Sequence, residues 1–209
     1  MVYRTTPLME KRKEARKKRL LEVAVRLFGR KGFHATTVPA IVKAAGTSTG
    51  NFYFYFRNKE DIYAAALQQI GEDISAALNA AIAAAAPGVL RQMRAAVRGL
   101  VGFLAEHPEE ARILIVESSG LGKHLETVRR QVVGSHTRSV EHALTAAAAQ
   151  LAPLDTAVAA SCWVGAVYEA VFHWLEQPPE QRVPAGHLAD TIARFNLRAV
   201  GAPNELLEE

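Results

Sequence analysis

The sequence predicts an all-α protein, and three observations support this fold class. Apolar residues recur every three or four positions over long stretches, a spacing that places them on one face of a helix. Alanine-rich segments such as "LNAAIAAAA", residues 78–86, favour helix. No stretch alternates apolar and polar residues as a half-buried strand does. We therefore expect helices along the chain, separated by short breaks that contain glycine or proline.

The helices of the first part of the chain can be placed from their start and stop signals. Gly32 stops the first helix, and Thr36 or Thr37 caps the second. Gly46 provides a tight turn before the third, and Asn58 opens the fourth. We expect these helices over residues 10–31, 37–44, 48–54 and 58–86.

Later helices are separated by breaks of the same chemistry, such as "SSGLG" and "QPPEQRVPAG". Residues 1–9 are expected to form a loose arm, and the tail after Gly201 is expected to fray. The remaining helices are expected over residues 88–106, 108–118, 123–151, 154–176 and 187–200.

Charge is distributed unevenly along the chain. Residues 1–59 carry 14 Lys and Arg against 3 Glu, a net charge of +11, whereas residues 60–209 carry 11 against 18 Asp and Glu, a net charge of −7. A strongly basic segment on an acidic remainder predicts a polyanionic partner for the basic segment. A solvated helix face would carry the same charges, so charge alone does not decide the function.

Cysteine usage and hydropathy indicate a cytoplasmic protein. Cys162 is the only cysteine, which excludes an intrachain disulfide and a cysteine-based metal cluster. The charged N-terminus lacks the apolar run of a signal peptide. The apolar stretch 156–174 is interrupted by Glu169 and His173, so we interpret it as a buried helix and expect no membrane association.

Residues 37–54 have the spacing of a helix-turn-helix, in which a second short helix enters the major groove of DNA. A helix over 37–44, a turn at Gly46 and a short helix over 48–54 fit that order. The segment "GTSTGNFYFYF", residues 46–56, places hydroxyl residues ahead of five consecutive aromatic residues. Aromatic side chains usually serve a core or an interface. A helix-turn-helix has both a packed core and a surface that faces DNA.

The segment "GFHATTVPAIVKAAGTSTGNFYFYFRNKEDIYAAAL", residues 32–67, resembles the DNA-binding segment of the TetR family of bacterial transcriptional regulators. A glycine–aromatic pair, a Thr pair, Ile–X–X–Ala–Ala–Gly, Ser–X–Gly, Tyr–X–Tyr–Phe and Lys–Glu all occur at the family's spacing. The resemblance is close over residues 10–67 and extends beyond them only in helical character and length. It implies an N-terminal three-helix DNA-binding domain, 10–57, and a C-terminal helical effector-binding and dimerisation domain, 58–203.

Two residues depart from the family's pattern. Val42 stands where the family commonly has Ala, and Thr47 where it commonly has Val. The larger Val42 is expected to open the angle between the two short helices slightly. Neither departure removes an expected DNA contact.

The resemblance also implies which residues of the N-terminal segment meet DNA. Thr49 and Asn51, early on the recognition helix, are expected to read base edges, and Tyr53 and Tyr55 to contact sugars, thymine methyl groups and phosphates. Phosphate contacts are expected from two helix N-termini, from the lysine that opens the long helix and from the basic run of the first helix, namely Thr37, Ser48, Lys59, Lys17, Lys18 and Arg19.

The other aromatic residues of the segment are expected to hold the recognition helix in place. Phe52 and Phe56 are spaced to look inward, and Phe54 is expected to pack against the long helix. Because phosphate contacts are blind to sequence, neutralising Lys17, Lys18 and Arg19 should weaken binding to every DNA sequence alike.

The acidic part of the chain is expected to bind a small effector and to form a homodimer, as the resemblance implies. An apolar cavity with a few polar groups is predicted from Phe103, Ile113, Leu114, Glu117, Val133, His136, Glu169 and His173. Plain core is the simpler explanation for the apolar members of this set. An apolar carboxylate or an acyl-CoA is the effector class that such a cavity favours.

Small residues among bulky ones on helix 154–176 indicate close helix packing across a two-fold axis, with helix 187–200 completing a four-helix bundle. The expected interface residues are Ala159, Trp163, Gly165, Ala166, Ala170 and Trp174. Packing within one chain would use the same pattern. A dimer would place two recognition helices about 34–36 Å apart on a palindromic operator.

Other functional classes are less well supported. The sequence has no phosphate loop and no His–Glu–X–X–His motif, and we expect no enzyme and no cofactor. The histidines show no paired metal-ligand spacing, so no metal site is expected. A non-specific architectural DNA binder would explain the charge, but not the motif or the acidic part. The resemblance favours a repressor that an apolar molecule releases from DNA.

Overall fold

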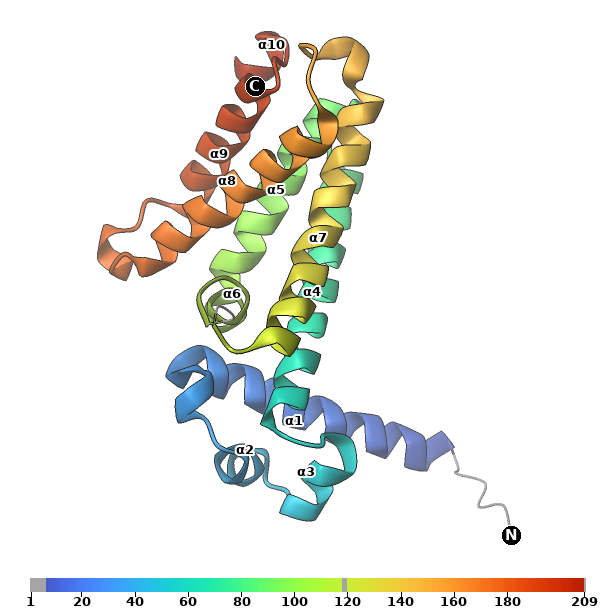
Figure 1. Ribbon diagram of the computed structural model, residues 1–209, viewed down its shortest axis with the longest axis vertical. Helices are drawn as coiled ribbons and strands as arrows, with labels where there is room; N and C mark the ends of the chain where they lie inside the picture. The colour runs from blue at the N-terminus through green and yellow to red at the C-terminus, as the bar shows by residue number, and fades with distance from the viewer. Residues whose placement is uncertain (1–6, 118–119, 209) are drawn as a thin grey trace.

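The computed structural model describes residues 7–117 and 120–208, and within these residues every regular element is a helix. This confirms the all-α prediction. Figure 1 shows two parts joined by one long helix, α4. We call α1–α3 the head and α4–α10 the body.

The helices agree closely with those expected from the sequence. Three short 3-10 or π segments lie between them, at Arg112–Glu117, Ala148–Gln150 and Pro179–Gln181. The α-helices are α1 (Pro7–Ala35), α2 (Val38–Ala45), α3 (Thr49–Tyr55), α4 (Lys59–Ala84), α5 (Val89–Glu106), α6 (Pro108–Ala111), α7 (Lys123–Ala146), α8 (Thr156–Glu176), α9 (Ala185–Ala199) and α10 (Glu205–Glu208).

The head has an apolar core built on one face of α1. Leu20, Val23 and Phe28 of that face are buried in it. Tyr63, from the second turn of α4, packs its ring against Phe28 with 4.9 Å between centroids. The start of α4 therefore belongs to the head core, although the domain boundary at residues 57 and 58 stays a prediction.

The body is a bundle in which α4 packs against α5 and α7, α5 against α9, and α7 against α8 (Figure 1). By length and composition alone, α8 is apolar enough to cross a membrane. A core helix has the same properties, and α8 contacts both α7 and α9. We therefore assign α8 to the core of the body, as expected from the sequence.

The segment expected as one helix over 108–118 has two parts. After α6, residues Arg112–Glu117 form a π-helix, called η1 here. A π-turn leaves carbonyl groups without their usual helical partners. Two of these carbonyls accept hydrogen bonds from side chains of other helices, Ile113 from the Tyr63 hydroxyl at 3.3 Å and Leu114 from Arg129 Nε at 3.0 Å.

Both chain ends differ from the expectation of loose segments. Pro7–Met9 are the first residues of α1, while residues 1–6 of the predicted arm lie outside the described residues. The tail after Gly201, expected to fray, forms α10 instead. Its Leu206 carbonyl accepts a hydrogen bond from Nη1 of the buried Arg94 at 3.0 Å, which fixes the tail to α5.

Candidate DNA interface and ligand cavity

The recognition helix α3 is positioned by side-chain caps and by a glycine turn. Gly46 adopts the left-handed conformation (φ 66°) after α2, which glycine reaches without a steric cost. Ser48 caps α3 by accepting the Asn51 amide at 3.2 Å. Of the two caps considered for α2, Thr37 is the one used, since its hydroxyl accepts the Ala40 amide at 3.3 Å.

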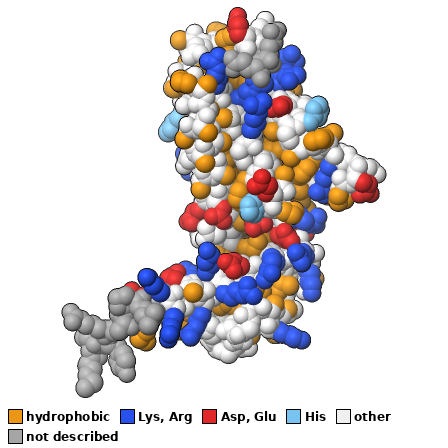
Figure 2. All heavy atoms as spheres, turned by 180° about the vertical axis from the view of Figure 1, so that it is seen from behind, with side chains coloured by type: hydrophobic (Ala, Val, Ile, Leu, Met, Phe, Trp, Pro, Cys, Tyr) orange, Lys and Arg blue, Asp and Glu red, His pale blue; other side chains and the backbone are white. Residues whose placement is uncertain are grey.

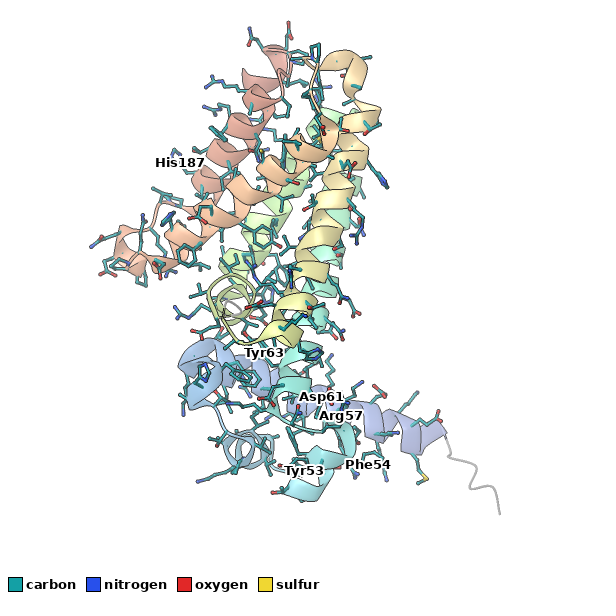
Figure 3. All side chains as sticks on the ribbon, viewed as in Figure 1. Tyr53, Phe54, Arg57, Asp61, Tyr63 and His187 are labelled. Atoms are coloured by element: carbon teal, nitrogen blue, oxygen red, sulfur yellow. The ribbon has the colours of Figure 1, made fainter. Side chains whose placement is uncertain are left out.

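The five aromatic residues of α3 and its C-cap face different surroundings. Phe52 and Phe56 are buried, which confirms their predicted inward orientation. Tyr53 is 55% exposed and lies at the end of the head furthest from the body (Figure 3). The prediction for Phe54 was wrong, because this ring is 65% exposed and lies beside α1, with Lys13 Nζ 5.0 Å from its centroid.

Asn51 is linked to Thr47, a contact that sequence reasoning missed. The Asn51 Nδ2 group donates to Thr47 Oγ1 at 2.7 Å. The two residues are four positions apart, across the start of α3. This spacing is the one feature of the sequence from which the contact could have been predicted. Valine, common at that position in the family, has no oxygen to accept the bond. Thr47 therefore leaves the amide oxygen of Asn51 to face a ligand in a fixed orientation.

The basic residues of α1 divide between two grooves. Arg12, Lys13 and Arg16 line one groove together with the α3 residues Asn51, Phe54 and Tyr55. Lys17, Lys18 and Arg19 line the other, which faces α4 and also contains four carboxylates, those of Glu14, Glu22, Asp73 and Glu110. Figure 2 shows how Lys and Arg side chains gather on the head. The whole basic run Lys11–Arg19 was expected to accompany the DNA-binding motif, but composition does not fix which of its members lie beside α3.

Lys59, the expected phosphate ligand, contacts the end of α1. Its Nζ donates to the Phe33 carbonyl at 2.8 Å and lies 4.1 Å from the centroid of that ring. The neighbouring residues Arg57 and Asp61 form an ion pair at 2.9 Å. Hydrogen bonds from Arg57 hold the pKa of the Asp61 carboxyl below its ordinary value. The first turn of α4 therefore anchors the head to the body.

The head and the body also meet where α1 crosses α6. Gly29 lies so close to α6 that a Cβ there would be 2.6 Å from the Cα of Glu109. Arg30 Nε donates to Glu109 Oε1 at 2.8 Å, and this hydrogen bond lowers the pKa of the Glu109 carboxyl. Tyr63, whose ring packs in the head core, also donates from its hydroxyl to the Ile113 carbonyl of η1. A rearrangement of α6 or η1 would therefore displace α1.

The body contains an apolar cavity of about 160 Å³ between α4, α5, α7 and α8. His136 and Tyr168 form a polar pair in its wall, with 2.9 Å between His136 Nδ1 and the Tyr168 hydroxyl. Burial lowers the pKa of His136 and raises that of Tyr168, so both are neutral near pH 7. The lining residues are Leu78, Ile82, Val89, Gln92, Met93, Ala96, Val97, Leu100, His136, Ser139, Val140, Ala143, Trp163, Val164, Val167 and Tyr168.

Comparison with known proteins identifies the family. The family model described as "Bacterial regulatory proteins, tetR family" matches residues 20–66, which contain the second half of α1, all of α2 and α3, and the start of α4. This match identifies residues 20–66 as a TetR-family segment. The HTH-type transcriptional regulator RutR of Escherichia coli (strain K12) is 32% identical over 114 residues, covering 54% of this chain and 53% of RutR. This chain thus spans about half the length of the first curated relatives it matches.

Solved structures match this chain over most of its length. The regulator FadR from Bacillus subtilis, in complex with stearoyl-CoA, has a TM-score of 0.76, covers 86% of this chain and 96% of its own, and is 20% identical. AibR, in complex with isovaleryl coenzyme A and operator DNA, has a TM-score of 0.71 with 20% identity and covers 86% and 97%. At such identities the likeness establishes the fold: a helix-turn-helix head on a helical body.

The residues predicted to bind an effector lie in several places. Only His136 lines the cavity. Ile113 and Leu114 are core residues of η1, Glu117 pairs with Arg112 at 3.4 Å, and Phe103 stacks on a histidine. Val133 is half-buried on α7, while Glu169 and His173 form an exposed pair on α8 at 3.1 Å. The cavity lies nearer the far ends of α4 and α7 than the prediction placed it.

The predicted dimer residues of α8 also divide between its faces. Trp163 lines the cavity, and Trp174 Nε1 donates to the Val183 carbonyl at 2.9 Å, so both serve the chain's own fold. Gly165 is exposed, while Ala159, Ala166 and Ala170 are half-buried. Among the described residues, no group of three His, Cys, Asp or Glu side chains is arranged to hold a metal ion.

Proposed function

We propose that this chain is a sequence-specific DNA-binding transcriptional regulator that acts as a homodimer in the cytoplasm. The observation that carries the proposal is the capped recognition helix α3, whose N-terminus and Tyr53 are exposed beside a basic groove. A short helix with an accessible N-terminus is the element that reads base edges in a helix-turn-helix. The family match over residues 20–66 supports the same role.

The predicted DNA contacts can be assigned roles from their geometry. Thr49 and Asn51 are proposed to read bases, since they begin α3 and Asn51 is oriented by Thr47. Thr37 and Ser48, at two helix N-termini, are proposed to bind phosphates with the backbone amides. Tyr53, Tyr55 and Lys59 extend the contact surface to the sugar–phosphate backbone.

The proposed dimer uses the exposed faces of α8 and α9, which contact each other in one chain. Val158 on α8 is 60% exposed and Phe195 on α9 is 62% exposed, unusual values for large apolar side chains. A Cβ at Gly165 would meet nothing within 4 Å, so this position leaves room for a second copy. Two heads related by a two-fold axis would read the half-sites of a palindrome.

We propose further that a small apolar molecule binds in the body cavity and weakens operator binding, so that the protein acts as a repressor. The relatives FadR and AibR were crystallised with acyl-CoA molecules, and acyl-CoA is one candidate class here. The ligand can weaken DNA binding only as far as it prefers a conformation in which the two recognition helices no longer match the spacing of successive major grooves.

Selection of random duplex DNA on the purified protein, at near-physiological salt, tests the proposed function. Enrichment of a palindrome with half-sites about one helical turn apart is the expected result. If no sequence is enriched and binding disappears as salt rises, the protein is not a sequence-specific regulator. It would then be a protein that coats DNA without sequence preference. The selected duplex then serves for a titration with candidate effectors.

A further inference from the structure

The wall of the body cavity has few polar groups and no charged residue among the residues that line it. Apart from the indole of Trp163, the polar side chains of the wall are those of Gln92, His136, Ser139 and Tyr168. Transfer of an ionised carboxylate into such a wall would require an opposite charge to offset the lost hydration. The lining therefore disfavours an anion inside the cavity.

His136 has an unused hydrogen-bonding atom. The side chain is 7% exposed, and its Nε2 has no hydrogen-bond partner within the described part of the chain. The other ring nitrogen is occupied by Tyr168, 2.9 Å away. A buried polar atom without a partner costs free energy, so a ligand that supplies the partner gains affinity.

The pair with Tyr168 determines which kind of partner His136 needs. If Nδ1 carried the proton, the buried Tyr168 hydroxyl would accept, and its own hydrogen would find no acceptor among the described residues. If the hydroxyl donates to Nδ1 instead, both groups are satisfied, and a neutral imidazole then carries its proton on Nε2. Nε2 is therefore a donor, since burial also lowers the pKa of the ring and keeps it uncharged.

We propose that the cavity binds a small, neutral and largely apolar ligand group whose hydrogen-bond acceptor, such as a carbonyl oxygen, is held by Nε2–H of His136. Tyr168 is a positioning residue that fixes the tautomer. This inference rests on the proposed function, because it names the chemistry of the same effector cavity. It replaces the carboxylate expected from the sequence, since that anion would meet no positive charge among the lining residues.

The cavity volume of about 160 Å³ limits the size of this group. A cavity of roughly 150 Å³ holds a benzene ring. Three probes of matched shape therefore test the proposal: acetophenone, which has a carbonyl; α-methylstyrene, which has a methylene group in its place; and benzoate, which is an anion. Calorimetric titration of the full chain measures binding of each probe without DNA.

The expected result is a preference for the ketone over the alkene that depends on His136. One neutral hydrogen bond contributes roughly 2- to 13-fold in affinity. The ratio of the two affinities should fall by about that factor in His136→Leu. It should also fall in Tyr168→Phe, because nothing then fixes the tautomer. Benzoate should bind more weakly than acetophenone.

Matched controls come from the two other polar side chains of the wall. Ser139 already donates to the Ser135 carbonyl at 3.1 Å. Ser139→Ala and Gln92→Leu should leave the ketone-to-alkene ratio unchanged. An unchanged ratio in His136→Leu, tighter binding of benzoate than of acetophenone, or no binding of any probe at millimolar concentration would overturn the proposal. If His136→Leu does not fold, the ratio of ketone to alkene affinity in Tyr168→Phe tests the proposal instead.

A neutral carbonyl can belong to a free small molecule or to the thioester of an acyl-CoA with its charged part outside. Displacement of acetophenone by isovaleryl-CoA, but not by coenzyme A, would support the thioester, whereas displacement by neither would support a free carbonyl compound. A further titration with operator DNA tests the effector role separately from the ligand chemistry of the cavity. If acetophenone binds through His136 without changing operator affinity, the effector role fails and the inference stands.

Discussion

The division of the α1 basic residues between two grooves leads to a quantitative prediction about DNA binding. Two triple variants carry the same change of three charges on the same helix, Arg12→Gln/Lys13→Gln/Arg16→Gln beside α3 and Lys17→Gln/Lys18→Gln/Arg19→Gln beside α4. If α3 enters the major groove, the first triplet faces the DNA backbone. The second shares its groove with carboxylates of α1, α4 and α6.

The expected magnitude follows from counterion release. Each phosphate contact contributes about 0.9 to the slope of log K against log salt, so three contacts contribute about 2.7 per head. At about 0.15 M salt this slope corresponds to a loss of roughly 100-fold in affinity per head. The variant of the second triplet should lose less than about fivefold in DNA affinity, because these three residues contribute at most through long-range electrostatic interactions that salt screens.

The assay is a fluorescence anisotropy titration of operator and random duplexes at several salt concentrations. The first variant should weaken both duplexes alike, because phosphate contacts carry no sequence information. Both variants should unfold in urea as the wild type does, since all six side chains lie on exposed residues. An equal or larger change of slope in the second variant would refute the assignment of the DNA-facing groove.

Three further predictions concern single residues. Thr47→Val removes the acceptor of Asn51 and should relax base preference at one operator position in repeated selection, with little change in urea stability. Gly29→Ala should lower the free energy of unfolding, measured in urea, by about 1–3 kcal/mol, because the new Cβ overlaps the α6 backbone. Gly102→Ala is the control, since a Cβ there meets open space, and it should raise the free energy of unfolding by roughly 0.5–1 kcal/mol. The pKa of Asp61 is held low by its arginine partner, so its stabilising contribution is complete above about pH 4 and lost as pH falls further; thermal unfolding of Asp61→Asn should lack that acid dependence.

The elements of the head could be predicted because their determinants are local. Ser48, Thr37 and Asn58 each cap a helix within three residues of themselves, and the observed hydrogen bonds follow that spacing. The burial of Phe52 and Phe56 follows from their separation of four residues along one helix and its cap. The exposure of Phe54 was missed because it depends on where α1 crosses α3.

The cavity could not be predicted residue by residue for a different reason. Its wall is assembled from four helices, and which face of each one turns inward is determined by packing between segments far apart in the sequence. His136 was named among the polar residues expected at the cavity. Its partner Tyr168, 32 positions away, was not, since no local spacing connects the two.

The two proposed sites lie at opposite ends of one continuous helix, and this arrangement determines how they can be coupled. Leu78 and Ile82, near the end of α4, line the cavity, while Lys59 and Tyr63, near its start, bind the head and η1. With 26 residues, α4 is about 39 Å long. A helix of unbroken hydrogen bonds transmits a small tilt as a larger displacement at its far end. Because α6 is packed against Gly29, such a tilt must either carry the head with it or break contacts at that crossing. If a ligand in the cavity tilts α4, we expect a coupling of the usual size, about 1–3 kcal/mol, between ligand binding and operator binding.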